Sequence, residues 1–481
     1  MMYGMGVVLS KAVAMIMLPV YTRYLTPADY GVLQLVAMTI EVISIIAGSR
    51  IATGIFHFYH KEVSEDGRRA VLSTAFFLLV VAYGVVCLAA FAAAPWIAGL
   101  VIREGPNGVT FVRVALAALA FESFFFVPVA YMQLHQRSGW FVTVQMVKLV
   151  IQLALNVVLL IPLGLGVLGV LISTLAANLL VGGVMAGLLL REVGIHVRAP
   201  IVRRLLRFGV PLMAMHVAAF VVSFGDRYFL NRAGGPEAVG LYGLAYQFGL
   251  LSITVAGLPF GLVWDPLRFG VAKRPDRDAV YARVFVYFNF LLVTIAVMIA
   301  LLGGDVVRVM ADEAFHPAGR LIPLLVAVFV LHAWAEFLNL GMLITERTEL
   351  VTVGHWLAAG VAMVGYLVVV PRFLAVGTAL VVLAAFGTRF ATSYYFSQRV
   401  WPIRYRWAPV LRLIALGVLV CGISQVLPQM HLAWSLLADA LLILAYGAGA
   451  YAFGGLSHAE RAALRGAVRS PLTFLRDLRV A

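Results

Sequence analysis

Long apolar stretches, each the length of a membrane-spanning helix, follow one another along nearly the whole chain. A helix needs about 20 mostly apolar residues to cross a bilayer, and such stretches recur between charges, prolines and glycine clusters. The expected spans cover residues 4–25, 31–57, 71–101, 109–131, 140–162, 167–190, 208–231, 238–264, 282–302, 320–344, 351–370, 374–397, 408–428 and 432–455. Because the breaks at 162–166 and 371–372 are short, the pattern predicts an all-α integral membrane protein with about 14 transmembrane helices (range 12–14).

The composition excludes a water-soluble fold. Of 481 residues, 63% are hydrophobic and 12% are charged, whereas soluble domains carry roughly 25% charged residues. The formal net charge of +14 is spread over short loops, which favours membrane lipids over nucleic acid as the partner. Lysine and arginine are enriched roughly three to one in the loops of one side, so both termini are expected in the cytoplasm.

A short motif recurs in the two halves of the chain. Arg-Tyr, an apolar residue and a turn containing proline and glycine occupy 23–31, and the same order occupies 227–240. Six expected spans precede the basic linker at 191–207 and six follow it, so the two halves point the same way and form parallel repeats, an arrangement typical of alternating access. The predicted organisation is a six-helix lobe at 1–190, a basic cytoplasmic linker at 191–207, a second six-helix lobe at 208–397, two additional transmembrane helices at 398–455 and a basic cytoplasmic amphipathic tail at 456–481, with a merely solvated tail as the alternative.

The motif residues also resemble those of a known family. The segment 18–31, with Arg23 and Gly31, is similar to the N-terminal signature of bacterial polysaccharide-export flippases. The segments 226–230 and 240–245, and Trp264-Asp265-Pro266, resemble the same family. The motif residues carried over are Arg23, Gly31, Asp226, Arg227, Gly240 and Tyr242. The chain thus looks like the Wzx-like flippases of the multidrug/oligosaccharidyl-lipid/polysaccharide (MOP) exporter superfamily.

This resemblance implies a fold, an activity and a location. The fold is a V-shaped pair of six-helix lobes with two extra C-terminal helices. The activity is the movement of an undecaprenyl-pyrophosphate-linked oligosaccharide from the cytoplasmic to the periplasmic leaflet of the bacterial inner membrane. The expectation is a monomer without a cofactor, coupled to H⁺, Na⁺ or the membrane potential, with glycan polymerase or export proteins as partners.

Seven charged residues fall inside the expected spans, where each costs at least about 2.5–3.5 kcal/mol near the bilayer centre unless it faces water or a partner. They are Lys11, Glu41, Arg50, Glu122, Lys148, Glu336 and Arg389. We expect Lys11, Arg50 and Lys148 to receive a pyrophosphate, with Arg389 also in the cavity; for Lys11 and Arg50 the alternative is contact with lipid headgroups.

The expected fifth span carries a single polar stripe. Gln145, Lys148, Gln152 and Asn156 are spaced three, four and four residues apart, which places them on one helical face. In lipid this face must look inward. It forms either a cavity wall, where the amides meet sugar hydroxyls, or a hydrogen-bonded seam between helices.

The intramembrane acids have two interpretations. Glu41, Glu122 and Glu336 either balance the charge of the cations, by pairing with Arg389 or Lys148, or carry a coupling ion. Asp226 and Arg227 are expected to cap a helix and fix the repeat turn rather than to bind substrate. None of the histidines singled out in the sequence, His57, His60, His135, His316 and His431, has metal-ligand spacing with another ligand.

Two other functions remain open. A drug or organic-cation antiporter of the same superfamily should favour acids in its pocket, but the intramembrane bases outnumber the acids by one. A membrane glycan polymerase or ligase should carry a long outward loop with catalytic groups, but the longest outward loop, 303–319, is short.

Overall fold

The computed structural model describes residues 17–102, 107–427 and 431–453. Within them, twelve helical stretches are long and apolar enough to cross a membrane, and the chain is a multi-pass membrane protein. The second to the fourteenth predicted spans each overlap described helices. Most of the first predicted span, with Lys11, lies outside the described residues, as does the predicted tail 456–481.

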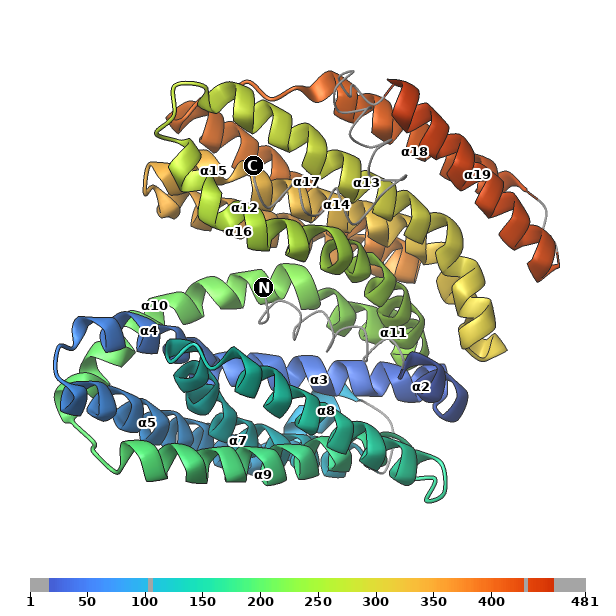
Figure 1. Ribbon diagram of the computed structural model, residues 1–481. Coiled ribbons are helices and arrows are strands. Elements are labelled where there is room, and N and C mark those ends of the chain that lie inside the picture. Colours follow the sequence, from blue (N-terminus) through green and yellow to red (C-terminus); the bar gives the residue numbers. More distant parts are fainter. Residues whose placement is uncertain (1–16, 103–106, 428–430, 454–481) are drawn as a thin grey trace.

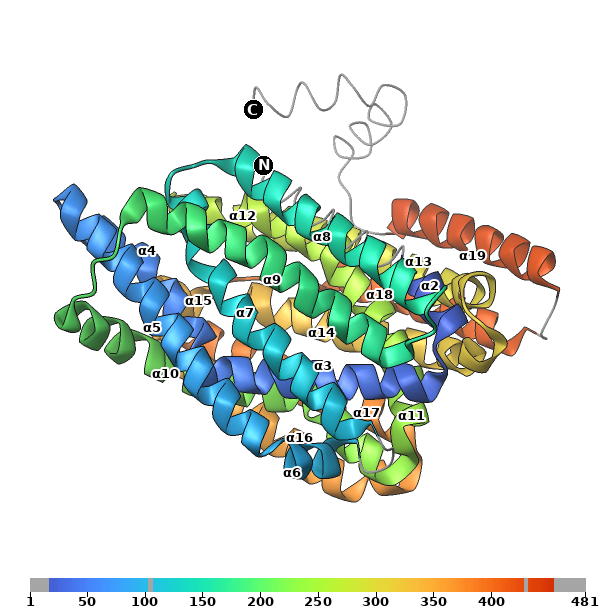
Figure 2. The same ribbon diagram turned by 90° about the horizontal axis from the view of Figure 1, so that it is seen from below.

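The N-terminal lobe consists of the helices from α2 to α9. Its elements are α2 (Leu18–Tyr24), α3 (Pro27–Ala47), η1 (Ser49–Ile51), α4 (Ala52–Lys61), α5 (Glu65–Ala92), α6 (Ala94–Val101), α7 (Gly108–Leu134), α8 (Ser138–Leu160) and α9 (Gly166–Val193). Figure 1 shows these helices as the lower layer, and Figure 2 views the same layer from below.

The C-terminal lobe forms the upper layer of Figure 1, and two further helices lie at its outer edge. Its elements are α10 (Ala199–Phe224), α11 (Asp226–Ser252), η2 (Ile253–Gly257), α12 (Leu258–Val271), α13 (Arg277–Met310), η3 (Glu313–Leu321), α14 (Ile322–Leu338), α15 (Leu340–Ile344), α16 (Thr348–Val368) and α17 (Val370–Val400). The outer pair consists of α18 (Trp407–Val426) and α19 (Leu432–Phe453).

Local sequence explains the breaks near the two repeat motifs. Thr26 caps α3: its hydroxyl accepts from the Asp29 amide at 3.1 Å, and Asp29 accepts from the Thr26 amide at 3.1 Å. Gly48 ends α3 in a left-handed conformation, with φ of 103°, so the predicted span 31–57 is kinked there. In the second repeat, Gly235 takes φ of 75° directly before Pro236. The break before Pro27 and the break before Pro236 therefore occupy equivalent positions in the two motifs.

Helix α10 connects the lobes. It begins inside the segment predicted as a linker, and its first half packs on the N-terminal lobe, where Phe208 covers Gly54 and Gly209 covers Ile51. Its second half contacts α16, because the Tyr366 hydroxyl donates to the Val222 carbonyl at 3.2 Å. One continuous helix thus touches both lobes.

The outer pair is held by apolar packing against α13. Val297 and Leu301 of α13 share a buried cluster with Leu413 of α18 and Tyr446 of α19. Gly417 lets α18 approach α13, since a Cβ at this position would lie 2.7 Å from a Val297 methyl group. This contact places the ends of α18 and α19 beside the end of α13.

Candidate functional site

The two repeat motifs meet each other at the crossing of α3 and α11. A Cβ built on Gly31 would lie 1.8 Å from the Pro236 carbonyl oxygen, and one built on Gly240 would lie 1.9 Å from the Pro27 carbonyl oxygen. Each lobe thus places the glycine of its motif against the proline backbone of the other motif. Close approach of two backbones requires residues without side chains, as in membrane helix pairs generally.

Side chains extend this contact along both helices. Gln34 of α3 packs on Gly243 of α11, and the hydroxyls of Thr39 and Tyr228 lie 3.0 Å apart. At the end of the bundle, Tyr30 meets the Phe315 ring edge-on. We call this region, centred on Gly31 and Gly240, the lobe crossing.

Behind the lobe crossing lies a buried ion pair. Arg227 and Asp226 are 1% and 0% exposed and are joined by a 2.9 Å ion pair. Asp226 also accepts from the Arg227 amide in the first turn of α11. The N-cap position is Gly225, and no side chain caps the helix there, so the pair is buried inside the first turn and does not form the expected cap. The guanidinium lies 4.1 Å from the centroid of Tyr246 and 5.3 Å from that of Tyr242. Asp226, Arg227 and Tyr242 are therefore buried residues that pack against one another within α11.

In the N-terminal lobe, Lys148 lies inside the helix bundle. Its Nζ atom is 4.5 Å from the centroid of the Phe125 ring, a cation–π contact. It also interacts electrostatically with Glu122 of α7, and Glu122 interacts electrostatically with Glu41 of α3. Among the described residues, no carboxylate lies within ion-pair distance of Lys148. We call Lys148, Glu122 and Glu41 the N-lobe cluster.

The polar stripe of α8 divides into two parts. Asn156 donates to the Tyr21 hydroxyl at 2.8 Å and accepts from Ser173, while Gln152 donates to Thr174 at 3.0 Å. The half-buried Gln145 lies one turn before Lys148. The exposed apolar face of α8 lies opposite, at Val147, Val150, Val157 and Val158. The stripe therefore looks inward, and its second part serves as a seam between helices.

In the C-terminal lobe, Arg389 is enclosed by partners. It forms an ion pair with Glu336 of α14 and donates to His332 Nδ1 at 3.0 Å. Asn339 also donates to Glu336, at 3.3 Å. Arg389 is 7% exposed and Glu336 is 51% exposed. We call Arg389, Glu336 and His332 the C-lobe cluster.

Two histidines of this region were not predicted from the sequence. His332 lies four residues before Glu336 on the same face of α14, and His355 of α16 interacts electrostatically with Arg389 and Glu336. The four-residue spacing of a histidine and a glutamate in an otherwise apolar span was the available signal.

Two of the remaining expected site residues cannot be placed within the described part of the chain. Lys11 is outside the described residues; Arg50 belongs to η1, but its side chain is outside them as well. Arg23 is exposed on α2. Among the described residues, no group of three or more histidine, cysteine or acidic side chains is arranged to hold a metal ion.

A family model described as polysaccharide biosynthesis protein matches residues 1–268, more than half of the chain. The chain belongs to this family. No curated protein sequence matches the chain, so the family assignment rests on the match to the family model.

Solved structures show the same fold at low sequence identity. The structure titled as lipid II flippase MurJ in an inward closed conformation has a TM-score of 0.74 at 10% identity, covering 93% of this chain and 98% of that one. An inward-facing multidrug resistance MATE family transporter of the MOP superfamily has a TM-score of 0.58 at 16% identity, over 81% and 94%. A MOP superfamily transporter from Pyrococcus furiosus has a TM-score of 0.55 at 17% identity, over 83% and 94%.

These comparisons confirm the expected family and fold class. The family is named for polysaccharide biosynthesis, and the fold is that of flippases and transporters of the MOP superfamily rather than of membrane enzymes.

Proposed function

We propose that this protein is an alternating-access flippase that moves an undecaprenyl-pyrophosphate-linked oligosaccharide from the cytoplasmic to the periplasmic leaflet of the bacterial inner membrane. The family match supports a role in polysaccharide export, and the shared fold with a lipid II flippase supports a lipid-linked substrate. The positive-inside distribution of the loops supports cytoplasmic termini.

The lobe crossing carries the mechanistic part of the proposal. Alternating access requires two lobes that separate at one end without unfolding. At the centre of the lobe crossing, Gly31 and Gly240 meet proline backbone without side chains of their own, and in this proposal the lobes part there as rigid bodies. In this proposal the lobe crossing lies at the periplasmic end. It is closed while the protein accepts substrate from the cytoplasmic side.

The N-lobe cluster supplies the headgroup contact. Lys148 is a cation with an aromatic neighbour but no ion-paired carboxylate among the described residues, so a pyrophosphate gains a full charge-assisted contact there. Gln145 lies beside it, and Lys11 and Arg50 complete the proposed anion site. Gln152 and Asn156 hold α8 against its neighbours, and Arg389 is already neutralised.

No cofactor takes part in this cycle. The energy comes from a proton, a sodium ion or the membrane potential, and Glu41, Glu122 and Glu336 are the candidates for ion coupling or for balancing the charge of the cations. We propose that a monomer is sufficient for transport and that glycan polymerase or export proteins take over the product.

The decisive experiment locks the lobe crossing. Gln34 and Gly243 are in contact, so Gln34→Cys and Gly243→Cys in one protein allow a reversible crosslink. Proteoliposomes containing a fluorescent undecaprenyl-pyrophosphate oligosaccharide report its transfer between leaflets. We expect transfer by the reduced protein, arrest on oxidation and recovery on reduction, with each single cysteine variant as the control. Transfer at the full rate by the oxidised, crosslinked protein contradicts the proposal.

A drug or organic-cation antiporter is the second candidate. It is favoured by the shared fold with MATE transporters and by the exposure of Glu41 and Glu336. Efflux of cationic drugs from a sensitised strain, together with failure to move the lipid-linked glycan in proteoliposomes, establishes this alternative.

A further inference from the structure

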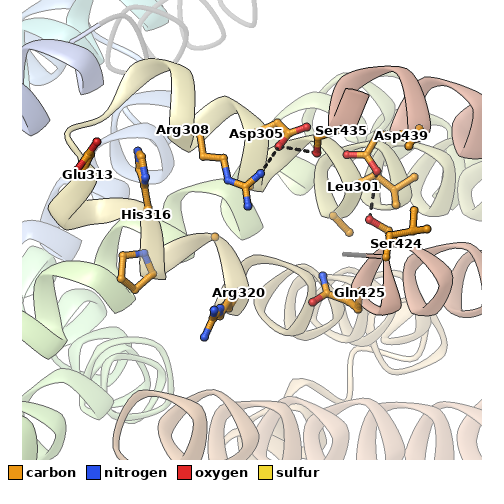
Figure 3. Close-up of a pocket in the computed structure, with 16 residues that line it drawn as sticks. Leu301, Asp305, Arg308, Glu313, His316, Arg320, Ser424, Gln425, Ser435 and Asp439 are labelled. Atoms are coloured by element: carbon orange, nitrogen blue, oxygen red, sulfur yellow. Dashed lines mark hydrogen bonds and ion pairs between the residues drawn. The ribbon is translucent and has the colours of Figure 1, made fainter. Parts of the chain in front are cut away.

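A polar cavity lies at the end of the C-terminal lobe, apart from the N-lobe and C-lobe clusters. Its volume is about 630 Å³, within the range of small-molecule sites. It is formed by the end of α13, by η3, by the end of α18 and by the start of α19 (Figure 3). We call it the end cavity. No part of the transport cycle described above uses it.

Its floor contains two buried carboxylates. Asp305 and Asp439 are 4% and 5% exposed. Asp305 Oδ1 accepts from Ser435 at 3.0 Å and from Arg308 at 3.2 Å, whereas its Oδ2 is buried without a hydrogen-bond partner. Asp439 accepts from Ser424 at 3.1 Å. The Oδ2 atom itself is closed to solvent, so the polar groups that a ligand meets are the others on the lining, including Asp439, Ser424 and Ser435.

Donor groups stand around these acceptors. The side chains of Arg308, Arg320 and Gln425 surround the open space in Figure 3, and His316 borders it from η3. The His316 Nε2 atom is buried without a partner. Side chains that donate and side chains that accept hydrogen bonds therefore both line the end cavity, and a ligand that carries both kinds of group matches this lining.

The charge pattern excludes a simple ion as the best occupant. The lining holds three carboxylates (Asp305, Glu313 and Asp439) and two guanidinium groups (Arg308 and Arg320). A pyrophosphate meets repulsion from the buried carboxylates, and a metal ion competes with the guanidinium that is already paired with Asp305. A neutral polyhydroxyl ligand satisfies both kinds of group, because each hydroxyl donates and accepts.

We propose that the end cavity binds neutral sugar units of a glycan. The choice of glycan rests on the proposed function, but the site is separate from the cation that receives the headgroup. Because the cavity is built partly from α18 and α19, it gives this additional helix pair a direct role in holding the sugar portion on the side where the lobes cross. The sugar belongs either to the carrier-linked oligosaccharide or to a soluble glycan chain.

Binding to the full-length protein in nanodiscs tests this site. The probes are maltotriose and chitotriose as soluble glycans, an undecaprenyl-pyrophosphate oligosaccharide as the carrier-linked glycan, and inorganic pyrophosphate as a competitor. We expect saturable binding of at least one glycan, no competition by pyrophosphate at this site, and an affinity at least tenfold lower in both Asp439→Asn and Gln425→Ala. Gln425 is exposed, so its replacement leaves the fold intact.

The control is Thr143→Ala, an exposed polar position on α8 of the other lobe, which should bind glycans as the unaltered protein does. Binding of only the carrier-linked probe, or of both classes, identifies the source of the sugar. Absence of saturable binding to every glycan, displacement of the soluble glycan by pyrophosphate, or unchanged affinity in both variants overturns the inference. Glycan binding without transfer between leaflets instead disproves the flippase proposal and leaves the end cavity assigned.

Discussion

The two lobes are alike where they meet and different where they carry charge. At the lobe crossing, Gly31 and Gly240 make reciprocal contacts with the opposite proline backbone. Deeper in the bundle, Arg389 of the C-lobe cluster is paired with Glu336 and His332, whereas Lys148 of the N-lobe cluster faces an aromatic ring. The repeat therefore supplies a symmetric contact between the lobes, while the side chains have diverged, so that Arg389 is ion-paired and Lys148, among the described residues, is not.

The largest expected effect comes from placing a side chain in the lobe crossing. Gly31→Ala or Gly240→Ala puts a methyl group less than 2 Å from a backbone carbonyl oxygen of the other lobe. We expect a cost of up to about 3 kcal/mol to the crossed state, as for overpacked interiors. Spin labels at the exposed positions Arg23 and Glu237 should show a longer distance between the lobes.

Gly183→Ala is the matched control for that experiment, because nothing lies within 4 Å of a Cβ at this position. It should leave both the distance and the transport rate unchanged. An unaltered distance distribution in Gly31→Ala and in Gly240→Ala contradicts the inference that both glycines make equivalent close contacts between the lobes.

The second effect concerns the paired cation. Arg389→Ala leaves Glu336 and His332 without their partner, and removing one member of a fully buried pair costs about 3–5 kcal/mol. Because Glu336 is half exposed, we expect about 2 kcal/mol, seen as a lower melting temperature in detergent. Glu336→Gln should restore part of this loss, and Arg399→Ala, an exposed arginine on the same helix, should melt normally. Normal melting of Arg389→Ala shows that the pair does not stabilise the lobe.

The third effect separates the two lobes by function. Lys148→Gln removes the cation that is proposed to bind the headgroup. It also removes the cation–π contact with Phe125, which contributes about 0.5–2 kcal/mol to stability, so the fold should be retained. We expect at least a tenfold fall in the transfer of the lipid-linked glycan, equivalent to about 1.4 kcal/mol, with most of the activity retained in Lys148→Arg. Full transport activity in Lys148→Gln removes this residue from the anion site.

The smallest effect is expected at the seam between α8 and α9. Gln152→Ala breaks one hydrogen bond to Thr174, and such contacts between membrane helices average about 0.6 kcal/mol. A double-mutant cycle with Thr174→Val measures the coupling through melting temperatures, and transport should continue at the normal rate. A transport defect as large as that of Lys148→Gln assigns the whole stripe to the cavity wall.

The sequence alone determined the features that depend on local pattern. Span length and hydrophobic content determined the helices, because in lipid the backbone N–H and C=O groups must find their hydrogen-bond partners within the helix. The repeat motifs at 23–31 and 227–240 indicated two lobes, and the three-four-four spacing on α8 predicted an inward face. Each of these properties belongs to one helix or to one turn.

Only the tertiary structure decided which helices face one another. Gly31 meets Gly240, Arg389 meets His332, and Asp305 meets Ser435 across long separations in sequence. The sequence pattern of one span specifies which face looks inward but not which neighbour lies there. Whether a buried charge is neutralised or free to bind a ligand is therefore set by packing, since it depends on groups that other helices bring within a few ångströms.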